Sequence, residues 1–337
     1  MKKNNKVLVI SEIGVNHNGK LQIAKKMVKK AADAGADVVK FQFFKTEKLV
    51  TTYAKKANYQ LKFDNKKNTQ FEMLKKLELS FKNFLSISKL CKKLKIEFCV
   101  SCFDIESLNL LKKIKVKRIK IPSGEITNYP LLKKIAKMRK KIIMSTGMST
   151  ITEINSAIDV LLKNGSKIKD ITLLQCNSEY PSPYKDANLL AIKQLKNVFK
   201  TSVGYSDHTK GIEASLAAVA LGASVIEKHI TLKKSSKGPD HQSSIEPNEF
   251  KRLVNSIRNI EIALGGGKKI VTNSENKNKK VVRKSIVASQ NISKGEKFTL
   301  KNLDTKRPGN GISPMLINKV IGKKANKNYK YNEAIKI

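Results

Sequence analysis

Two of the chain's four histidines, His208 and His229, stand at the ends of consecutive short apolar runs of the kind that form buried strands. This is a placement typical of metal ligands. With Glu12 or a substrate oxygen completing the coordination shell, two imidazoles in a mostly oxygen-lined site suit Mn²⁺, Co²⁺ or Mg²⁺ better than a thiolate-rich zinc site does. The alternative is a pair of hydrogen-bonded histidines in the core.

Other apolar runs are also interrupted or followed by polar side chains. These residues are Glu12, Lys40, Gln42, Ser101, Lys120, Ser123, Glu125, Ser145, Ser178, Tyr180, Ser206, Asp207 and Glu227. One buried lysine or glutamate is as often a structural ion pair as a functional group. Because desolvating such groups is costly, a coherent set of them indicates a polar ligand. The lysines and serine hydroxyls offer charge and hydrogen bonds to an anion that carries both phosphate and carboxylate.

Lys120 has a second possible role. A lysine within a strand can form a Schiff base with a carbonyl substrate, as in class I aldolases. A site with two histidine ligands instead favours activation of the carbonyl by a metal acting as a Lewis acid. The two mechanisms seldom share one site, so we expect the metal-dependent one.

The order of elements predicts how these residues are held. Short β-rich runs alternate with segments whose apolar residues recur every three or four positions, as in Leu21, Ala24, Met27, Val28 and Ala31. The expected strands are Val7–Ser11, Val38–Gln42, Glu97–Ser101, Arg118–Pro122, Lys141–Thr146, Ile171–Asn177, Val203–Asp207 and Ser224–His229. Eight such units close naturally into a (β/α)₈ TIM barrel, in which functional residues lie at the carboxyl ends of the strands.

The pattern changes after the barrel, which we expect to span residues 1–264. Residues 265–280 begin with three glycines and are rich in lysine and asparagine, which is typical of a linker. Residues 281–337 contain short apolar runs and turn signals, and they predict a small, separate β-rich domain.

Composition limits the class of protein. The net charge of +41 comes mostly from lysines spread along the chain, without the arginine clusters or interleaved aromatic residues of a nucleic-acid-binding face. No apolar run is long enough for a membrane span or a signal peptide, so the cytoplasm is the expected compartment. The four cysteines lack the paired spacing of a zinc ribbon and are expected to be reduced thiols.

A series of short polar motifs then points to a family. The motifs are Glu12–Gly19, Val39–Gln42, Lys120–Glu125, Ser145–Met148, Tyr180–Pro181, Gly204–Thr209, Glu227–His229 and Lys306–Ser313. In this order they resemble the sialic acid synthase family, and the last resembles its C-terminal antifreeze-like (SAF) domain. One departure is Val100-Ser101-Cys102-Phe103, where the family usually has Ser-Thr-Pro-Phe; Ser101 keeps the hydroxyl.

The resemblance implies a reaction. C3 of phosphoenolpyruvate would attack the open-chain aldehyde of an N-acylated mannose-type sugar, and the C–O bond to phosphate would be cleaved. The first expectation for the sugar is N-acetylmannosamine, which gives N-acetylneuraminate. The alternative is the 2,4-diacetamido-2,4,6-trideoxymannose of legionaminic acid, or its pseudaminic counterpart. A more distant alternative is a non-catalytic barrel that binds anions or nucleic acid.

The resemblance also implies a role for each matching residue. His208 and His229 would hold the metal, and Glu12 and Glu125 would handle water and protons. The phosphate and carboxylate of phosphoenolpyruvate would contact Lys40, Lys120, Ser101, Ser123, Ser145, Ser178 and Ser206. The sugar would face Gln42, Tyr180, Asp207, Glu227 and Asp240. Arg307 would reach the partner subunit's site in a domain-swapped homodimer.

Overall fold

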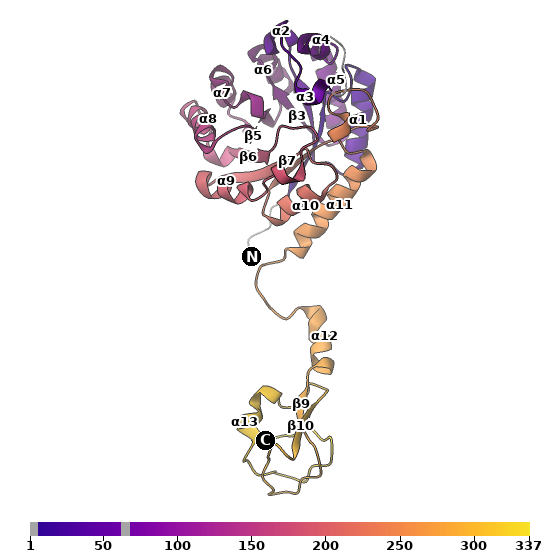
Figure 1. The fold of residues 1–337 in the computed structure, drawn as a ribbon, viewed down its shortest axis with the longest axis vertical. Coiled ribbons are helices and arrows are strands. Elements are labelled where there is room, and N and C mark those ends of the chain that lie inside the picture. The colour runs from indigo at the N-terminus through magenta and orange to yellow at the C-terminus, as the bar shows by residue number, and fades with distance from the viewer. Residues whose placement is uncertain (1–5, 62–67) are drawn as a thin grey trace. The chain divides into compact units, whose positions relative to one another are not determined.

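The eight expected strands form one closed parallel barrel, in which each strand pairs with the next and β8 pairs with β1 (Figure 1). The computed structural model describes residues 6–61 and 68–337. The strands are β1 (Leu8–Gly14), β2 (Val38–Phe43), β3 (Glu97–Cys102), β4 (Arg118–Ile121), β5 (Lys141–Ser145), β6 (Ile171–Cys176), β7 (Ser202–Asp207) and β8 (Val225–His229). The predicted TIM barrel is therefore confirmed.

Helices connect the strands and cover the outside of the barrel (Figure 1). They are α1 (Leu21–Asp33), α2 (Thr46–Leu49), α3 (Asn58–Leu61), α4 (Gln70–Lys75), α5 (Phe81–Lys93), α6 (Ile105–Leu111), α7 (Tyr129–Ala136), α8 (Ile151–Lys163), α9 (Ala191–Phe199), α10 (Glu213–Ala220) and α11 (Pro247–Ala263). The described residues of the connection between β2 and β3 form four α-helices, whereas the connections between the other successive strands contain one each.

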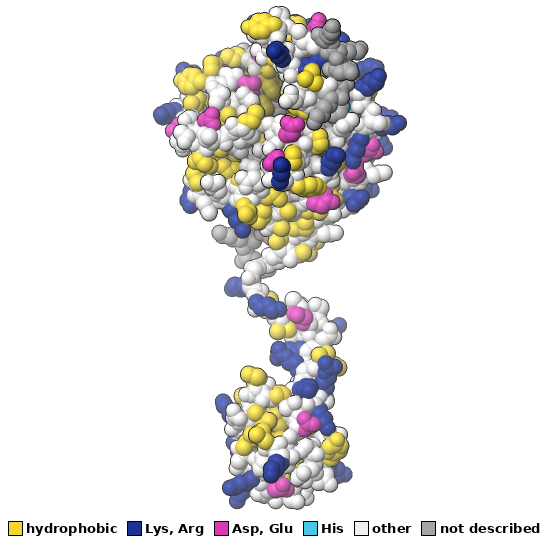
Figure 2. Space-filling model, viewed as in Figure 1, with side chains coloured by type: hydrophobic (Ala, Val, Ile, Leu, Met, Phe, Trp, Pro, Cys, Tyr) yellow, Lys and Arg dark blue, Asp and Glu magenta, His cyan; other side chains and the backbone are white. Residues whose placement is uncertain are grey.

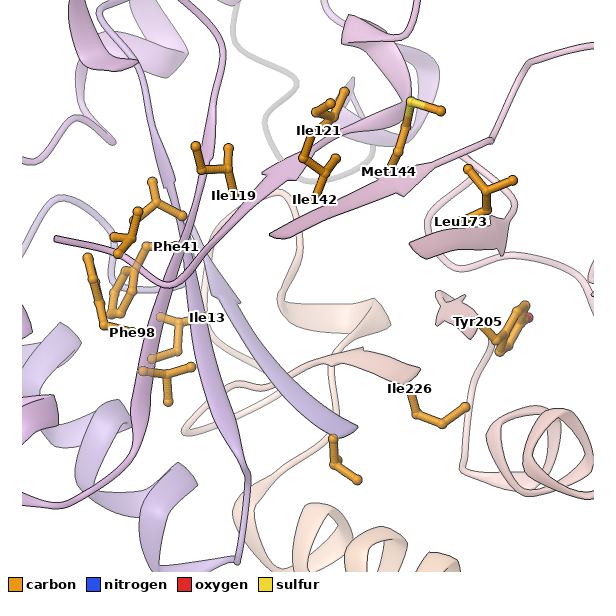
Figure 3. Close-up of a cluster of buried hydrophobic side chains, with 14 of the residues drawn as sticks. Ile13, Phe41, Phe98, Ile119, Ile121, Ile142, Met144, Leu173, Tyr205 and Ile226 are labelled. Carbon is orange, nitrogen blue, oxygen red and sulfur yellow. The ribbon is translucent and has the colours of Figure 1, made fainter. Parts of the chain in front are cut away.

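The two faces of each strand have different surroundings, because successive side chains point to opposite sides of a strand. One set packs with helix residues in a large apolar cluster, which includes Phe41, Tyr205 and Ile226 (Figure 3). The other set forms a small cluster of strand residues, which closes the barrel interior at the end where the strands begin: Ile10, Val38, Cys99, Ile143, Leu174 and Val225. This alternation decides which residues can face a ligand inside the barrel.

The second unit has its own core. The chain divides into the compact units Met1–Gly265 and Gly266–Ile337. In the second, β9 (Ser285–Ala288) and β10 (Leu303–Lys306) form an antiparallel pair, and α13 (Ile317–Val320) contributes to a core that contains Phe298 and Tyr329. This agrees with the predicted small β-rich domain.

The stretch expected to be a linker contains a helix, α12 (Asn273–Val282). Its N-terminus is a capping box: the Thr272 hydroxyl accepts from the Glu275 backbone N–H, and the Glu275 carboxylate accepts from the Thr272 N–H. None of its residues is buried. Local capping therefore forms a helix in a segment whose composition alone indicates a linker.

The surface is basic without a single patch on the face shown. Lysine and arginine side chains are scattered over the barrel unit, with acidic and apolar side chains between them (Figure 2). Within residues 6–61 and 68–337, no helix is long and apolar enough to cross a membrane. The four cysteines are free and buried.

A glycine on β7 gives a test of the packing inside the barrel. A Cβ added at Gly204 would lie 2.3 Å from the Val225 carbonyl oxygen and 2.7 Å from Leu174 Cδ2. Gly204→Ala should therefore lower the free energy of unfolding by roughly 1–3 kcal/mol, measured from urea denaturation midpoints. Gly266→Ala is the control, because its Cβ would meet nothing within 4 Å. Equal midpoints for the two variants would contradict this packing.

Candidate active site

A layer of polar side chains lies directly above the small apolar cluster of the barrel interior. Six of its eight members stand two positions further along their strands than an apolar member, as Glu12 follows Ile10 and Lys40 follows Val38. Because side chains alternate, both members of such a pair point into the barrel. The polar layer consists of Glu12, Lys40, Ser101, Lys120, Ser145, Cys176, Ser206 and Glu227.

Two lysines and two glutamates form the charged centre of this layer. Lys40 Nζ lies 2.8 Å from Glu12 Oε2 and 3.6 Å from Glu227 Oε1, and Lys120 Nζ lies 3.0 Å from Glu227 Oε1. Each of the four residues is at most 3% exposed. Lys40 also donates to Ser101 Oγ at 3.1 Å, and Ser206 Oγ donates to Glu227 at 3.0 Å. Serines that the sequence assigned to an anion therefore belong to the same network as the lysines.

The two carboxylates differ in their tendency to ionise. Burial raises the pKa of Glu12 to about 7, although Lys40 opposes the shift. Burial also acts to raise the pKa of Glu227, but Lys120 and Lys40 outweigh it and hold that pKa below its ordinary value. Glu12 can thus exchange a proton near neutral pH, whereas Glu227 stays ionised.

The two histidines lie together at the carboxyl end of the barrel. Their ring centroids are 5.4 Å apart. His208 Nδ1 lies 2.5 Å from the Asn177 carbonyl oxygen. Since a carbonyl can only accept, Nδ1 carries the proton and Nε2 presents a lone pair. His229 Nδ1 is buried without a hydrogen-bond partner among the described residues, and Asp240 Oδ2 lies 3.8 Å from it.

Burial keeps both rings neutral. It lowers the pKa of His208 to about 4 and the pKa of His229 well below its ordinary value. Neutral imidazoles with available lone pairs are the form that binds metal. No group of three or more His, Cys, Asp or Glu side chains within the described ranges is arranged to hold a metal. A metal held by these two histidines would therefore need its remaining ligands from substrate or water.

Aromatic rings form one wall beside the histidines. The Tyr180 ring lies 4.2 Å from the His208 ring and 5.7 Å from the His229 ring, centroid to centroid. The ring of Tyr59, in α3, lies 5.0 Å from the Tyr180 ring, centroid to centroid. Tyr59 was missed from the sequence, because its helix is a single short turn within the long β2–β3 connection and carries no periodic pattern.

A second group of hydroxyls gathers after β5. The Gly147 N–H donates to Ser123 Oγ at 3.1 Å, and Ser123 Oγ lies 3.2 Å from Cys176 Sγ. A Cβ added at Gly147 would lie 2.5 Å from Ser178 Oγ. The structure therefore brings Ser123 and Ser178 together around a glycine that no larger residue could replace without displacing them.

Two expected site residues, Glu125 and Arg307, make none of the contacts described above. Glu125 accepts a hydrogen bond from Asn128 at 2.6 Å, and burial raises its pKa. Arg307 is exposed in the second unit. Gln42 and Asp240, in contrast, lie beside the charged centre and the histidines, since Gln42 Nε2 donates to Glu12 Oε1 at 3.4 Å.

Asp207 requires a correction, because it points away from the barrel interior and not towards a sugar. Its carboxylate accepts from Ser215 of α10 at 2.6 Å and pairs with Lys228 at 2.9 Å. It follows Ser206, which points inward, so alternation along β7 places it on the outer face.

Comparison with known proteins identifies the family of the chain. The chain matches the NeuB family over residues 27–269 and the SAF domain over residues 283–336. It is 54% identical to the N,N'-diacetyllegionaminic acid synthase of Campylobacter jejuni, over 98% of this chain and 99% of that protein. It is 35% identical to the human N-acetylneuraminate-9-phosphate synthase, over 94% of this chain and 88% of that protein.

A solved structure gives the same result. The N-acetylneuraminic acid synthetase of Leptospira borgpetersenii, in complex with citrate, superposes with a TM-score of 0.71 at 38% identity, over 82% of this chain and 90% of that one. The sialic acid synthase resemblance is thereby confirmed. The chain belongs to the NeuB family and is an enzyme that carries its catalytic barrel and its SAF domain on one polypeptide.

Proposed function

We propose that the chain condenses phosphoenolpyruvate with the open-chain form of 2,4-diacetamido-2,4,6-trideoxymannose, to give N,N'-diacetyllegionaminate and phosphate. The observation that carries the reaction is the placement of two buried lysines and two neutral histidines on one barrel rim. The choice of sugar replaces the first expectation, N-acetylmannosamine. Synthases named for diacetyllegionaminic acid are 54% and 45% identical to the chain, whereas the human N-acetylneuraminate-9-phosphate synthase is 35% identical.

The anionic substrate fits the lysine side of the site. Lys40 and Lys120 supply two ammonium groups, and the serines around them supply hydroxyl donors. Phosphoenolpyruvate carries a phosphate and a carboxylate, so it can replace some of the contacts that the lysines make with Glu12 and Glu227. The group around Gly147, with Ser123 and Ser178, offers further donors for the phosphate.

The sugar fits the histidine side. His208 and His229 would hold a divalent metal, with Mn²⁺ expected before Mg²⁺ or Co²⁺. When bound, such an ion polarises the aldehyde and stabilises the negative charge that develops on its oxygen. Tyr180 forms a wall of this side, while Gln42 and Asp240 offer polar groups to the sugar. Arg307 is proposed to reach the site of a partner subunit in a domain-swapped homodimer.

Proton and water handling would fall to the glutamates. As C3 of phosphoenolpyruvate bonds to the aldehyde carbon, C2 becomes electron-poor and water must add to it before the C–O bond to phosphate breaks. A carboxylate that titrates near neutral pH is suited to orient that water and take its proton. Glu12 meets this condition. Glu125, whose pKa is raised by burial, is the other candidate.

The choice of sugar can be tested by phosphate release. With phosphoenolpyruvate and Mn²⁺ present, kcat/KM for the trideoxymannose should exceed that for N-acetylmannosamine by at least about tenfold, because unmatched polar groups in a pocket are costly. The pseudaminic counterpart should also be a poor substrate. Faster turnover of N-acetylmannosamine would restore the first expectation. No release with any sugar, beside salt-sensitive RNA binding, would favour a non-catalytic barrel.

Replacing either histidine should remove the metal-dependent activity. His208→Ala and His229→Ala should each lower kcat on the order of a hundredfold or more, because the developing alkoxide loses its stabilisation. Chelation of the wild-type enzyme should give the same loss, and added Mn²⁺ should restore only the wild type. Metal-dependent activity that persists in either variant would place the metal elsewhere.

The role of Glu12 predicts a pH profile. As a base it must be deprotonated, so kcat of the wild type should rise as pH increases through about 7, the pKa to which burial raises Glu12. Glu12→Gln should lower kcat by about 10²–10⁴-fold and should lack this inflection. An unchanged inflection in the variant would assign it to another group, and Glu125→Gln then becomes the variant to measure.

A further inference from the structure

A buried ion pair lies on the outer face of β7 and β8, next to the two histidines at the ends of these strands. Asp207 precedes His208 on the chain, and Lys228 precedes His229. Asp207 and Lys228 are register partners across β7 and β8, and Nζ lies 2.9 Å from Oδ2. Both side chains have no exposed surface. The pair therefore joins the two strands immediately beside the histidines but does not contact the barrel interior.

The pair also fixes the residue after His208. Asp207 Oδ1 accepts from the Thr209 N–H at 2.8 Å and from the Thr209 hydroxyl at 2.7 Å. Lys228 Nζ donates to the Thr209 carbonyl at 2.6 Å. Thr209 is thus held through its N–H, its side chain and its carbonyl. Because Asp207 and Thr209 flank His208, the backbone that orients this imidazole is constrained on both sides.

The pair is anchored to a helix as well. Asp207 Oδ2 accepts from the Ser215 hydroxyl of α10 at 2.6 Å. Two positions earlier on the same outer face, Tyr205 and Ile226 belong to the apolar cluster between strands and helices (Figure 3). An apolar pair could therefore fill the positions of Asp207 and Lys228. Replacing a buried ion pair with apolar residues of similar size is often neutral for stability.

We propose that Asp207 and Lys228 are positioning residues, which set the distance and orientation of the His208 and His229 rings from outside the barrel. The inference rests on the proposed function, in which these two rings hold the metal. Ion-pair and hydrogen-bond geometry are directional, whereas an apolar contact is not, so the pair fixes the ends of β7 and β8 more narrowly than packing alone would. Partners that orient metal-binding histidines typically change metal affinity about 10–100-fold when they are altered.

The test compares two double variants of the full chain. Asp207→Leu with Lys228→Met replaces both charged side chains with apolar ones; methionine matches lysine in size, whereas leucine is larger than aspartate. Glu97→Leu with Arg118→Met is the control. This ion pair also joins neighbouring strands, with 2.5 Å between Arg118 Nε and Glu97 Oε1, but it lies where β3 and β4 begin, far along the barrel from the histidines. Asp207→Asn is a milder third variant, for use if the first double variant does not fold.

The first readout is the metal-free protein. The chain has four histidines, so ring-labelled histidine should give four resolvable Cε1–Hε1 signals in a two-dimensional spectrum. In the Asp207/Lys228 variant the signals of His208 and His229 should move, while those of His17 and His241 should stay. The control should leave all four unchanged. Unmoved His208 and His229 signals in a folded variant would overturn the proposal.

The second readout is Mn²⁺ affinity, measured by electron paramagnetic resonance on metal-free protein. The Asp207/Lys228 variant should bind Mn²⁺ about 10–100-fold more weakly than wild type and control. Equal affinities would overturn the positioning role. If wild type itself binds no Mn²⁺ at these histidines, the metal assignment of the proposed function fails, and the histidine signals still decide whether the pair orients the rings.

Discussion

Four ionisable side chains closed inside the barrel are the constraint on which the rest of the structure depends. Glu12, Lys40, Lys120 and Glu227 come from four different strands, and each is at most 3% exposed. Removing one member of such a buried pair typically costs about 3–5 kcal/mol, because the other charge is left without a partner. The strands must therefore be held in a register that keeps every member paired. The closed sheet does this, and the apolar layer below excludes water from that end.

Because side chains alternate, each strand presents one set of residues to the barrel interior and another to the helices. Inward positions carry the residues of the candidate site, and outward positions pack against helices. Burial raises the pKa of Glu12 to about 7 but leaves Glu227 ionised, because Lys120 and Lys40 are both close to Glu227. One environment thus leaves Glu12 able to exchange a proton near neutral pH and keeps Glu227 as a fixed charge. Asp207 and Lys228 are the exception, since they place a charged pair on the outer face.

Much of this could be predicted from the sequence, because strand identity and alternation are local properties. The eight strands were expected within one to three residues of their observed ends, and the inward serines, lysines and glutamates follow from the same runs. Asp207 was assigned wrongly, although alternation from Ser206 contains the signal that corrects it. Tyr59 could not be found, because its contact with Tyr180 depends on the tertiary arrangement of the long β2–β3 connection. Helix α12 was not predicted, because the lysine- and asparagine-rich composition of its segment indicates a linker.

The central claim is that a carbon–carbon bond forms to phosphoenolpyruvate with cleavage of its C–O bond to phosphate. It is tested most directly with phosphoenolpyruvate that carries ¹⁸O at the bridging position, Mn²⁺ and the diacetamido-trideoxymannose, with both products identified by mass. We predict one N,N'-diacetyllegionaminate for each phosphate, with the label in the phosphate. A label that stays in the organic product, or phosphate release without a nine-carbon product, would contradict the account.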